Sequence, residues 1–157
     1  MSQYWLMKSE PNECSIDDAL AAPDATVPWT GVRSYQARNF MRDAMKVGDG
    51  VLFYHSSCPE PGIVGIARVA SGVRPDPTQF DAASPYYDAA SKPDNPRWLL
   101  LDVQALRKTR VLGLPELRAT SALAEMVVLR KGNRLSITPV TAAEWDIVVN
   151  LLGLNQI

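Results

Sequence analysis

The stretch from Trp29 to Arg42 holds the side chains in this sequence that are best suited to binding chemistry. Trp29 follows a proline and precedes Thr30 and Gly31, which is a setting typical of a loop. Glycine lets another group approach the backbone closely, and a loop tryptophan offers a flat face on which a base can stack. Trp29 also fits no periodic apolar stripe, so we expect it to lie outside the core and to line a ligand pocket.

A basic stripe follows on the predicted helix 35–46, where Arg38, Arg42 and Lys46 recur every four residues. Like charges at this spacing repel each other by a few tenths of a kcal/mol, so a free helix would disfavour them. A solvated helix face is one explanation. Phosphate binding by Arg38 and Arg42 is the other, and the neighbouring aromatic and basic residues support it.

Residues typical of catalysis are scarce. His55 is the single histidine, and a histidine at the end of a strand is more often structural than catalytic. The sequence has no Gly-x-Ser-x-Gly elbow, no phosphate-binding glycine loop and no cluster with metal-ligand spacing. Cys14 and Cys58 lie too far apart for a metal motif, and we interpret both as structural. We therefore predict no metal, no cofactor and no enzymatic activity; a hydrolase using His55 with a nearby aspartate stays open.

Composition and charge are those of a globular protein that folds as one domain over residues 1–157. The net charge is −1, but residues 97–134 contain eight Lys or Arg against three Asp or Glu. Arg makes up eleven of the sixteen basic residues, which suits phosphate contacts. The chain has no apolar run long enough to cross a membrane and no signal-peptide pattern at its start. We expect a cytoplasmic monomer that does not bind membranes.

Hydrophobic periodicity and capping residues predict a mixed fold. Strands are expected at 4–8, 51–55, 63–70, 98–106, 127–129 and 135–138. Helices are expected at 16–21, 35–46 and 142–152, with short ones after 115 and 121. Residues 23–28 and 71–96 are interpreted as loops, and Trp5, Trp98 and Trp145 as core residues. The sum is an α+β fold with a small curled sheet or barrel of five to six strands, surrounded by short helices.

Several ordered motifs carry a family resemblance. They are Trp5-Leu-Met-Lys-Ser-Glu-Pro, Trp29-x-Gly-Val-Arg-x-Tyr-Gln-Ala-Arg-Asn, Phe53-Tyr-His-Ser, Arg134-Leu-Ser and the closing Glu144-Trp. Together these motifs make the chain, from residue 4 to 152, resemble the EVE domain family and in particular its single-domain bacterial members. The resemblance implies a PUA-like β-barrel related to YTH domains. It also implies recognition of modified bases, such as methylated or hydroxymethylated cytosine in DNA or modified nucleotides in RNA.

The base site that we predict combines this resemblance with the loop and strand-end residues. Trp29 would supply the stacking face, and Lys8, Ser9, His55 and Ser56 the contacts to the base edge. The residue that closes the pocket opposite Trp29 is left open among Phe80, Tyr86 and Trp98. The full predicted set is Lys8, Ser9, Trp29, Thr30, Gly31, Val32, Arg33, Tyr35, His55, Ser56, Phe80, Tyr86 and Trp98.

The sequence leaves three functions open. The first is a non-enzymatic reader whose partner is a nucleic acid carrying a modified base. The second is an enzyme that acts on a modified nucleotide or nucleoside in the same pocket. The third is a protein-interaction module.

Overall fold

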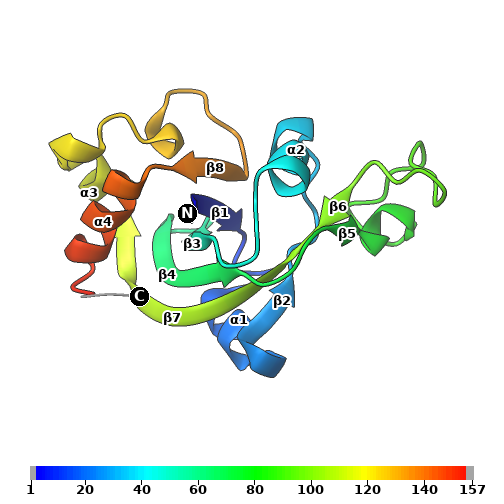
Figure 1. Ribbon diagram of the computed structural model, residues 1–157, viewed down its shortest axis with the longest axis horizontal. Helices are drawn as coiled ribbons and strands as arrows, with labels where there is room; N and C mark the ends of the chain where they lie inside the picture. The colour runs from blue at the N-terminus through cyan, green and yellow to red at the C-terminus, as the bar shows by residue number, and fades with distance from the viewer. Residues whose placement is uncertain (1–2, 155–157) are drawn as a thin grey trace.

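A six-stranded curled sheet organises the computed structural model, which describes residues 3–154 (Figure 1). Its strand order is β2-β7-β4-β3-β1-β8, and β5 and β6 form a separate two-stranded ribbon. The strands are β1 (Tyr4–Ser9), β2 (Thr26–Pro28), β3 (Gly50–His55), β4 (Gly62–Val69), β5 (Arg74–Pro75), β6 (Leu99–Leu100), β7 (Asp102–Gly113) and β8 (Ile137–Val140). The helices are α1 (Ile16–Ala21), α2 (Tyr35–Asp43), α3 (Leu114–Ala119) and α4 (Ala142–Leu151). Short 3₁₀ turns are η1 (Pro23–Ala25), η2 (Pro77–Phe80), η3 (Ser121–Leu123) and η4 (Val127–Leu129).

The sheet is open, which corrects the barrel that the resemblance implied. β2 pairs with β7 alone and β8 with β1 alone, so these two strands form the edges. β1 runs parallel to β3, and the other neighbours are antiparallel. The β4–β7 register shifts twice, between Ile63 and Gly65 and between Ile66 and Ala67. Such irregularities increase local twist, and β7 sweeps in an arc around the sheet in Figure 1.

Alternating side chains divide the core between the two faces of the sheet. Met7 and Phe53 point into one hydrophobic cluster with α1 and α2, whereas Leu6 and Leu52 point into the other with α3 and α4. This is the two-residue period of a strand that is buried on both faces. Trp145 belongs to the second cluster and stacks on Tyr4 with ring centroids 4.5 Å apart, which confirms its core role.

The predicted helix starts are confirmed. Ser15 and Asp18 form a reciprocal capping box at α1, and Thr141 and Glu144 form the same arrangement at α4. Each box satisfies two amide donors that the first helical turn leaves free. Ser34 caps α2 by accepting a hydrogen bond from the Ala37 amide.

Helix α2 ends at Asp43 rather than at the predicted residue 46. The buried carboxylate of Asp49 accepts a hydrogen bond of 3.0 Å from the Lys46 amide and another of 3.0 Å from the Trp5 indole. The Lys46 amide therefore has a partner outside the helix. Because of this, Lys46 does not continue the basic stripe of Arg38 and Arg42.

One predicted strand is wrong, another begins two residues later than predicted, and both predicted loops contain a short strand. Residues 127–129 form the 3₁₀ turn η4, because consecutive amides bond to carbonyls three residues earlier. The last strand begins at Ile137 and not at Leu135, whose amide bonds to the Asn133 side chain. The expected loop 23–28 contains β2, and the expected loop 71–96 contains β5 and η2. The expected strand 98–106 divides into β6 and β7 at Leu101, and β7 continues beyond the expected end to Gly113.

Candidate functional site

A cavity of about 630 Å³ opens at the end of β1, where five distant segments of the chain meet. These segments are the turn after β1, the loop after β2, the end of β3, the loop after η2 and the segment before β8. Eight predicted site residues line it: Lys8, Ser9, Trp29, Thr30, Gly31, Val32, Ser56 and Tyr86. The fold therefore brings these eight predicted residues together around one cavity, whereas the role of each residue in binding stays a prediction.

Trp29 lies between this cavity and the core. Its side chain is 6% exposed, and its ring meets Phe53 edge to face with centroids 5.2 Å apart. Its amide donates to the Leu101 carbonyl at 2.9 Å, which ties the loop to the break between β6 and β7. The expectation that Trp29 stays clear of the core is thus wrong. The ring serves the core and the cavity wall at once.

Tyr86 forms a second aromatic wall and lies against the backbone of Gly31. Gly31 has a φ of +84°, and a Cβ atom there would lie 2.7 Å from the Tyr86 ring. Only glycine fits this position. The Tyr86 hydroxyl donates to both Glu13 carboxylate oxygens, at 2.6 Å each. Burial and then the Glu13 hydrogen bond raise the pKa of Tyr86 well above its usual value, so the phenol stays protonated.

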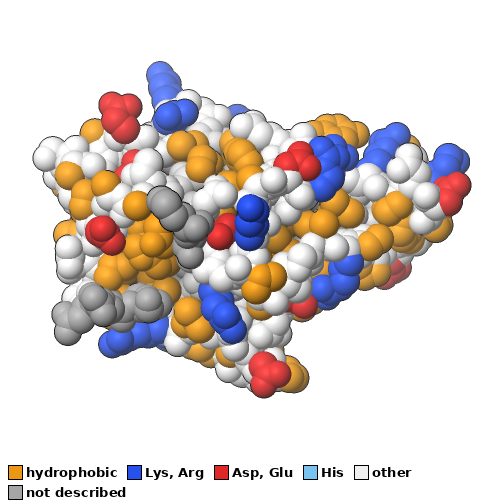
Figure 2. Space-filling view, in the orientation of Figure 1, with side chains coloured by type: hydrophobic (Ala, Val, Ile, Leu, Met, Phe, Trp, Pro, Cys, Tyr) orange, Lys and Arg blue, Asp and Glu red, His pale blue; other side chains and the backbone are white. Residues whose placement is uncertain are grey.

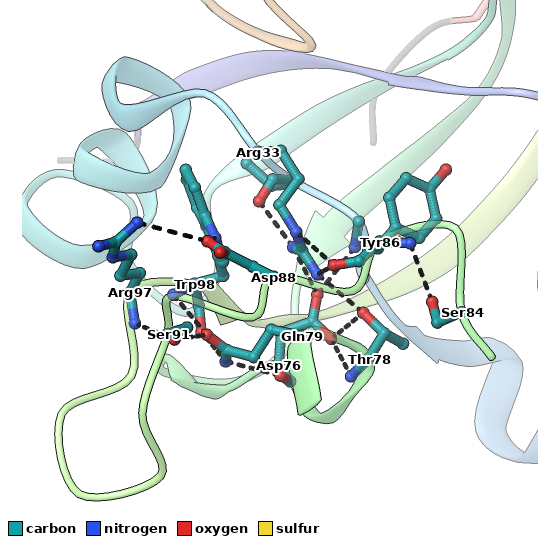
Figure 3. Close-up of polar contacts among 12 residues, drawn as sticks. Arg33, Asp76, Thr78, Gln79, Ser84, Tyr86, Asp88, Ser91, Arg97 and Trp98 are labelled. Carbon is teal, nitrogen blue, oxygen red and sulfur yellow. Dashed lines mark hydrogen bonds and ion pairs between the residues drawn. The ribbon is translucent and has the colours of Figure 1, made fainter. Parts of the chain in front are cut away.

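Asp76 and Arg33 hold the two walls together (Figure 3). The Asp76 side chain is fully buried and accepts hydrogen bonds from the Gly31 amide at 2.9 Å and the Thr78 hydroxyl at 2.6 Å. Arg33 pairs with Asp76 at 3.1 Å and donates twice to the Tyr86 carbonyl, at 3.0 and 2.8 Å. Burial alone would raise the pKa of Asp76, but these hydrogen bonds outweigh it and hold the pKa below its usual value.

Gln79 fixes the irregular segment that carries Tyr86 (Figure 3). Its buried amide group donates to the carbonyls of Asp76 and Trp98, both at 2.7 Å, and its oxygen accepts from the Ser91 hydroxyl at 2.6 Å. The Trp98 indole in turn donates to Asp88 at 2.8 Å. A segment that the sequence presents only as a proline-rich loop is therefore ordered by buried polar side chains.

The polar groups along the cavity carry both signs of charge. Lys8 is half-buried, and burial lowers its pKa. Arg134 lies on the same cavity, as do the carboxylates of Glu10 and Glu13. Ser9 turns its hydroxyl to the Cys14 carbonyl at 2.6 Å. Donors and acceptors are thus both available to a planar polar ligand.

His55 does not line the cavity. Its Nε2 accepts a hydrogen bond of 3.1 Å from the Ile16 amide, at the start of α1. Burial lowers the pKa of His55, which favours the neutral ring that this bond requires. The predicted contact of His55 with a ligand thus lacks a counterpart, and a structural role for this lone histidine describes it better.

Four other predicted residues also lie off the cavity. Tyr35 is 53% exposed and stacks on Trp98 with ring centroids 5.0 Å apart. The Arg33 guanidinium carbon lies 5.5 Å from the centroid of the Trp98 ring and 5.5 Å from that of the Tyr86 ring. Phe80 lies at the end of η2 and is partly exposed. Among the three aromatic residues left open for closing the pocket, Tyr86 alone lines it.

The predicted phosphate-binding pair makes contacts within the protein. Arg38 donates to the Asn39 side chain at 2.8 and 3.1 Å, and Arg42 forms a two-pronged pair with Asp43 at 2.9 and 3.0 Å. Neither lines the cavity. Their binding of phosphate stays a prediction.

Sequence reasoning missed several lining residues, chiefly Glu10, Glu13, Thr78, Arg134 and Ser136. Glu10, Arg134 and Ser136 lie inside motifs that carry the family resemblance, and that was a usable signal. Glu13 and Thr78 had none, because their roles arise only when the turn after β1 meets the segment around η2.

Residues 3–154 contain neither a metal cluster nor a membrane span. No group of three or more His, Cys, Asp or Glu side chains in this part of the chain is arranged to hold a metal ion. Within the same residues no helix is long and apolar enough to cross a membrane.

The EVE domain family model matches residues 3–151. The chain belongs to the EVE domain family. Human thymocyte nuclear protein 1 is 45% identical over 168 residues, which span 96% of this chain and 74% of the human protein. The crystal structure of human THYN1 protein in complex with DNA containing 5-methylcytosine superposes with a TM-score of 0.89 at 44% identity, over 99% of this chain and 100% of that one.

A more distant likeness concerns the fold of this EVE domain alone. The YTH domain of the Zygosaccharomyces rouxii MRB1 protein, solved in complex with N6-methyladenosine RNA, gives a TM-score of 0.57 at 14% identity. The superposition covers 99% of this chain and 87% of the YTH domain. The relationship to YTH domains that the resemblance implied is confirmed at the level of fold.

Proposed function

We propose that this EVE domain is a non-enzymatic module that binds a modified base in nucleic acid, with 5-methylcytosine in DNA as the first ligand to test. One observation carries the proposal: the cavity at the end of β1 has Trp29 and Tyr86 among its lining residues, and charged groups of both signs beside them. The human relative crystallised with DNA containing 5-methylcytosine supports it. A modified nucleotide in RNA is the other form of the same ligand.

The cavity suits a base that has been turned out of its stack. An extruded base needs a flat face to stack on and polar groups to read its edge. Trp29 or Tyr86 would supply the face. The Lys8 ammonium would donate to ring or carbonyl acceptors, and the Glu10 or Glu13 carboxylate would accept from an exocyclic amine, as carboxylates do with cytosine N4.

Apolar lining residues offer a contact for an added methyl group. Val27, Pro28 and Val32 contribute to the cavity beside Trp29. Burying one methyl against such a surface stabilises a complex by about 0.8 kcal/mol. This part of the wall would give a modified base its advantage over the unmodified one.

The enzyme alternative depends on His55 as a base, and its position argues against that role. The Nε2 atom is occupied by the Ile16 amide, and the ring is absent from the cavity lining. The Cys14 thiol does line the cavity, but burial and then the charge of Asp18 raise its pKa, so it is a poor nucleophile. The geometry supports binding over hydrolysis.

The test compares two neighbouring tyrosines. Tyr86 lines the cavity, whereas Tyr87 is exposed and lies outside it. Affinity should be measured for oligonucleotides with and without one 5-methylcytosine, and for matched RNA with a modified nucleotide. We expect Tyr86→Ala to lose about 1–3 kcal/mol of binding to the modified strand, the usual worth of one base–aromatic stack, and Tyr87→Ala to bind like the parent.

Three results would contradict the proposal. Equal affinity of the parent for modified and unmodified strands would remove the reader function. Turnover of a modified nucleoside would support the enzyme. A protein partner that is captured from nuclease-treated lysate, together with no oligonucleotide binding, would support the interaction module.

A further inference from the structure

Three exposed cations lie together in one short turn before β8. Arg130, Lys131 and Arg134 project from this segment, which we call the basic turn (residues 130–134). None of the six ion pairs found within residues 3–154 involves them, and their side chains donate no hydrogen bond to any described residue. Figure 2 shows Lys and Arg side chains projecting at the upper edge of the molecule, above the segment that joins η4 to β8 in Figure 1.

The backbone of the basic turn is held in place by its own hydrogen bonds. The Asn133 amide bonds to the Arg130 carbonyl at 3.1 Å, and Gly132 takes a φ of +76° to allow the reversal. The Asn133 side chain donates to the Val127 carbonyl at 3.0 Å and accepts from the Leu135 amide at 3.1 Å. The three cations are therefore presented by a built turn rather than by a free loop.

The same turn borders the candidate base site. The Lys8 amide donates to the Ser136 carbonyl at 2.8 Å, so the end of the turn is fastened to the end of β1. Arg134, Ser136 and Lys8 all line the cavity. The basic turn thus lies at the rim of the site where a base would enter.

The predicted phosphate-binding residues on α2, Arg38 and Arg42, differ from the basic turn because their side chains already have partners within the protein. We call these two residues the α2 pair. Arg42 is already neutralised by Asp43, and Arg38 is held by Asn39. A phosphate at the α2 pair would have to displace these partners, whereas a phosphate at the basic turn would displace only water and counterions.

The carboxylates inside the cavity add a constraint on where phosphates can lie. Glu10 and Glu13 line the cavity itself, so a phosphate placed deep within it would be repelled. A base has no such penalty and can use the carboxylates as acceptors. The charge distribution therefore favours the base inside and the phosphates outside, on the cationic rim.

We propose that the basic turn is the backbone-binding element of this domain and that it holds the phosphodiester chain of the strand whose base enters the cavity. The inference rests on the proposed reader function. Phosphate contacts position a strand and carry no base identity. The basic turn should therefore contribute affinity equally to modified and unmodified strands, while the cavity contributes the preference between them.

The test measures affinity against salt for the full chain, with DNA oligonucleotides that carry or lack one 5-methylcytosine. The variant replaces Arg130, Lys131 and Arg134 by Gln. Each lost phosphate contact lowers the slope of log K against log salt by about 0.7 for single strands and about 0.9 for duplex, so the triple variant should lose about 2 to 3. The ratio of affinities for the two strands should stay at the parental value.

The matched controls use other basic residues. Arg68→Gln removes an exposed arginine that bonds to Gln104 and lines a different hollow, and it should leave the salt slope unchanged. Replacement of the α2 pair by Gln tests the rival location. The three turn side chains are exposed and make no ion pair with any described residue, so the triple variant should melt at the parental temperature.

The outcomes separate the two proposals. If the parent prefers the modified strand but the triple variant keeps the parental slope, the inference about the basic turn fails and the reader function stands. The inference fails in the same way if only the α2 pair changes the slope. If the parent binds neither strand, the reader function fails and the inference fails with it. A triple variant that loses the preference itself would place these residues at the base and also overturn the inference.

Discussion

We predict that Arg33 acts as part of the framework of the cavity, which its side chain does not line, and substitution to Ala tests this directly. Its guanidinium donates to the Val32 and Tyr86 carbonyls and to the side chains of Asp76 and Thr78, over 2.8–3.1 Å. Only 21% of the side chain is exposed. Arg33→Ala removes all of these bonds together.

The expected loss of folding free energy follows from the environment of Asp76 after the substitution. Its carboxylate is fully buried and would lose the cationic partner that it has among the described residues. Breaking a buried pair in this way typically destabilises a protein by about 3–5 kcal/mol, because an uncompensated charge remains. The partial exposure of Arg33 lets water replace some bonds, so we expect a cost at the lower end, about 3 kcal/mol. Arg42→Ala breaks a surface pair and should cost only about 0–1 kcal/mol.

Urea titration of the two variants at neutral pH measures these costs, and repetition at lower pH gives a second readout. The pKa of Asp76 is depressed in the folded state. Its stabilising contribution is therefore present above the unfolded-state pKa of about 3.9 and is lost as the pH falls through the folded-state value. Arg33→Ala removes one cause of the depression, so its acid-induced loss should begin at a higher pH than in the parent. A cost below about 1 kcal/mol with an unchanged acid limb would refute the framework role.

Three further predictions concern the cavity walls. Trp29→Ala should lower the free energy of unfolding by about 3 kcal/mol in urea titration, because the ring packs on the core, while Trp29→Phe should retain most of it; equal stability of both variants would contradict this. Gly31→Ala should lower the melting temperature and weaken binding of the modified strand, because the new Cβ meets the Tyr86 ring. The control Gly48→Ala has a similar φ of +95° but no neighbour within 4 Å, so it should show only backbone strain of about 1–3 kcal/mol. Identical effects of the two variants would exclude the Tyr86 clash. Replacing Cys14 and Cys58 by Ser should leave both the unfolding curve and the affinity for modified strands near parental values, and a folded double variant that no longer binds would show a functional thiol.

Local signals in the sequence were enough for the elements whose formation is local. Ser15 and Thr141 each begin a helix because the capping partner lies three residues away on the same segment. The central strand β3 could be predicted because its side chains are buried on both faces and form one apolar run. The end of α2 was predicted wrongly, because Asp49 accepts the Lys46 amide and is itself held by the Trp5 indole, 44 residues away in the chain.

The same distinction explains why some predicted site residues do not line the cavity. Trp29 and Gly31 were found because loop tryptophan and glycine are visible in the sequence. Arg33 was assigned to the ligand because nothing near it shows the buried Asp76, which lies 43 residues further along the chain. His55 was assigned likewise, although its partner is the Ile16 amide, 39 residues away. A charged or aromatic side chain looks available in a sequence until the fold supplies its partner.

If the proposed reader function holds, the buried polar framework gives a physical reason why the cavity would distinguish one methyl group. A single methyl contact is worth about 0.8 kcal/mol, which corresponds to roughly a fourfold difference in affinity. Such a small difference survives only if the wall cannot relax around the smaller base. Asp76 fixes Gly31 and Arg33, and Arg33 fixes Tyr86, so one wall is held by bonds that the ligand does not touch. The Phe53 contact holds Trp29 from the core side. Under the proposed function, rigid walls made in this way would convert a contact of about 0.8 kcal/mol into selectivity, and loosening any one of them should cost discrimination before it costs binding.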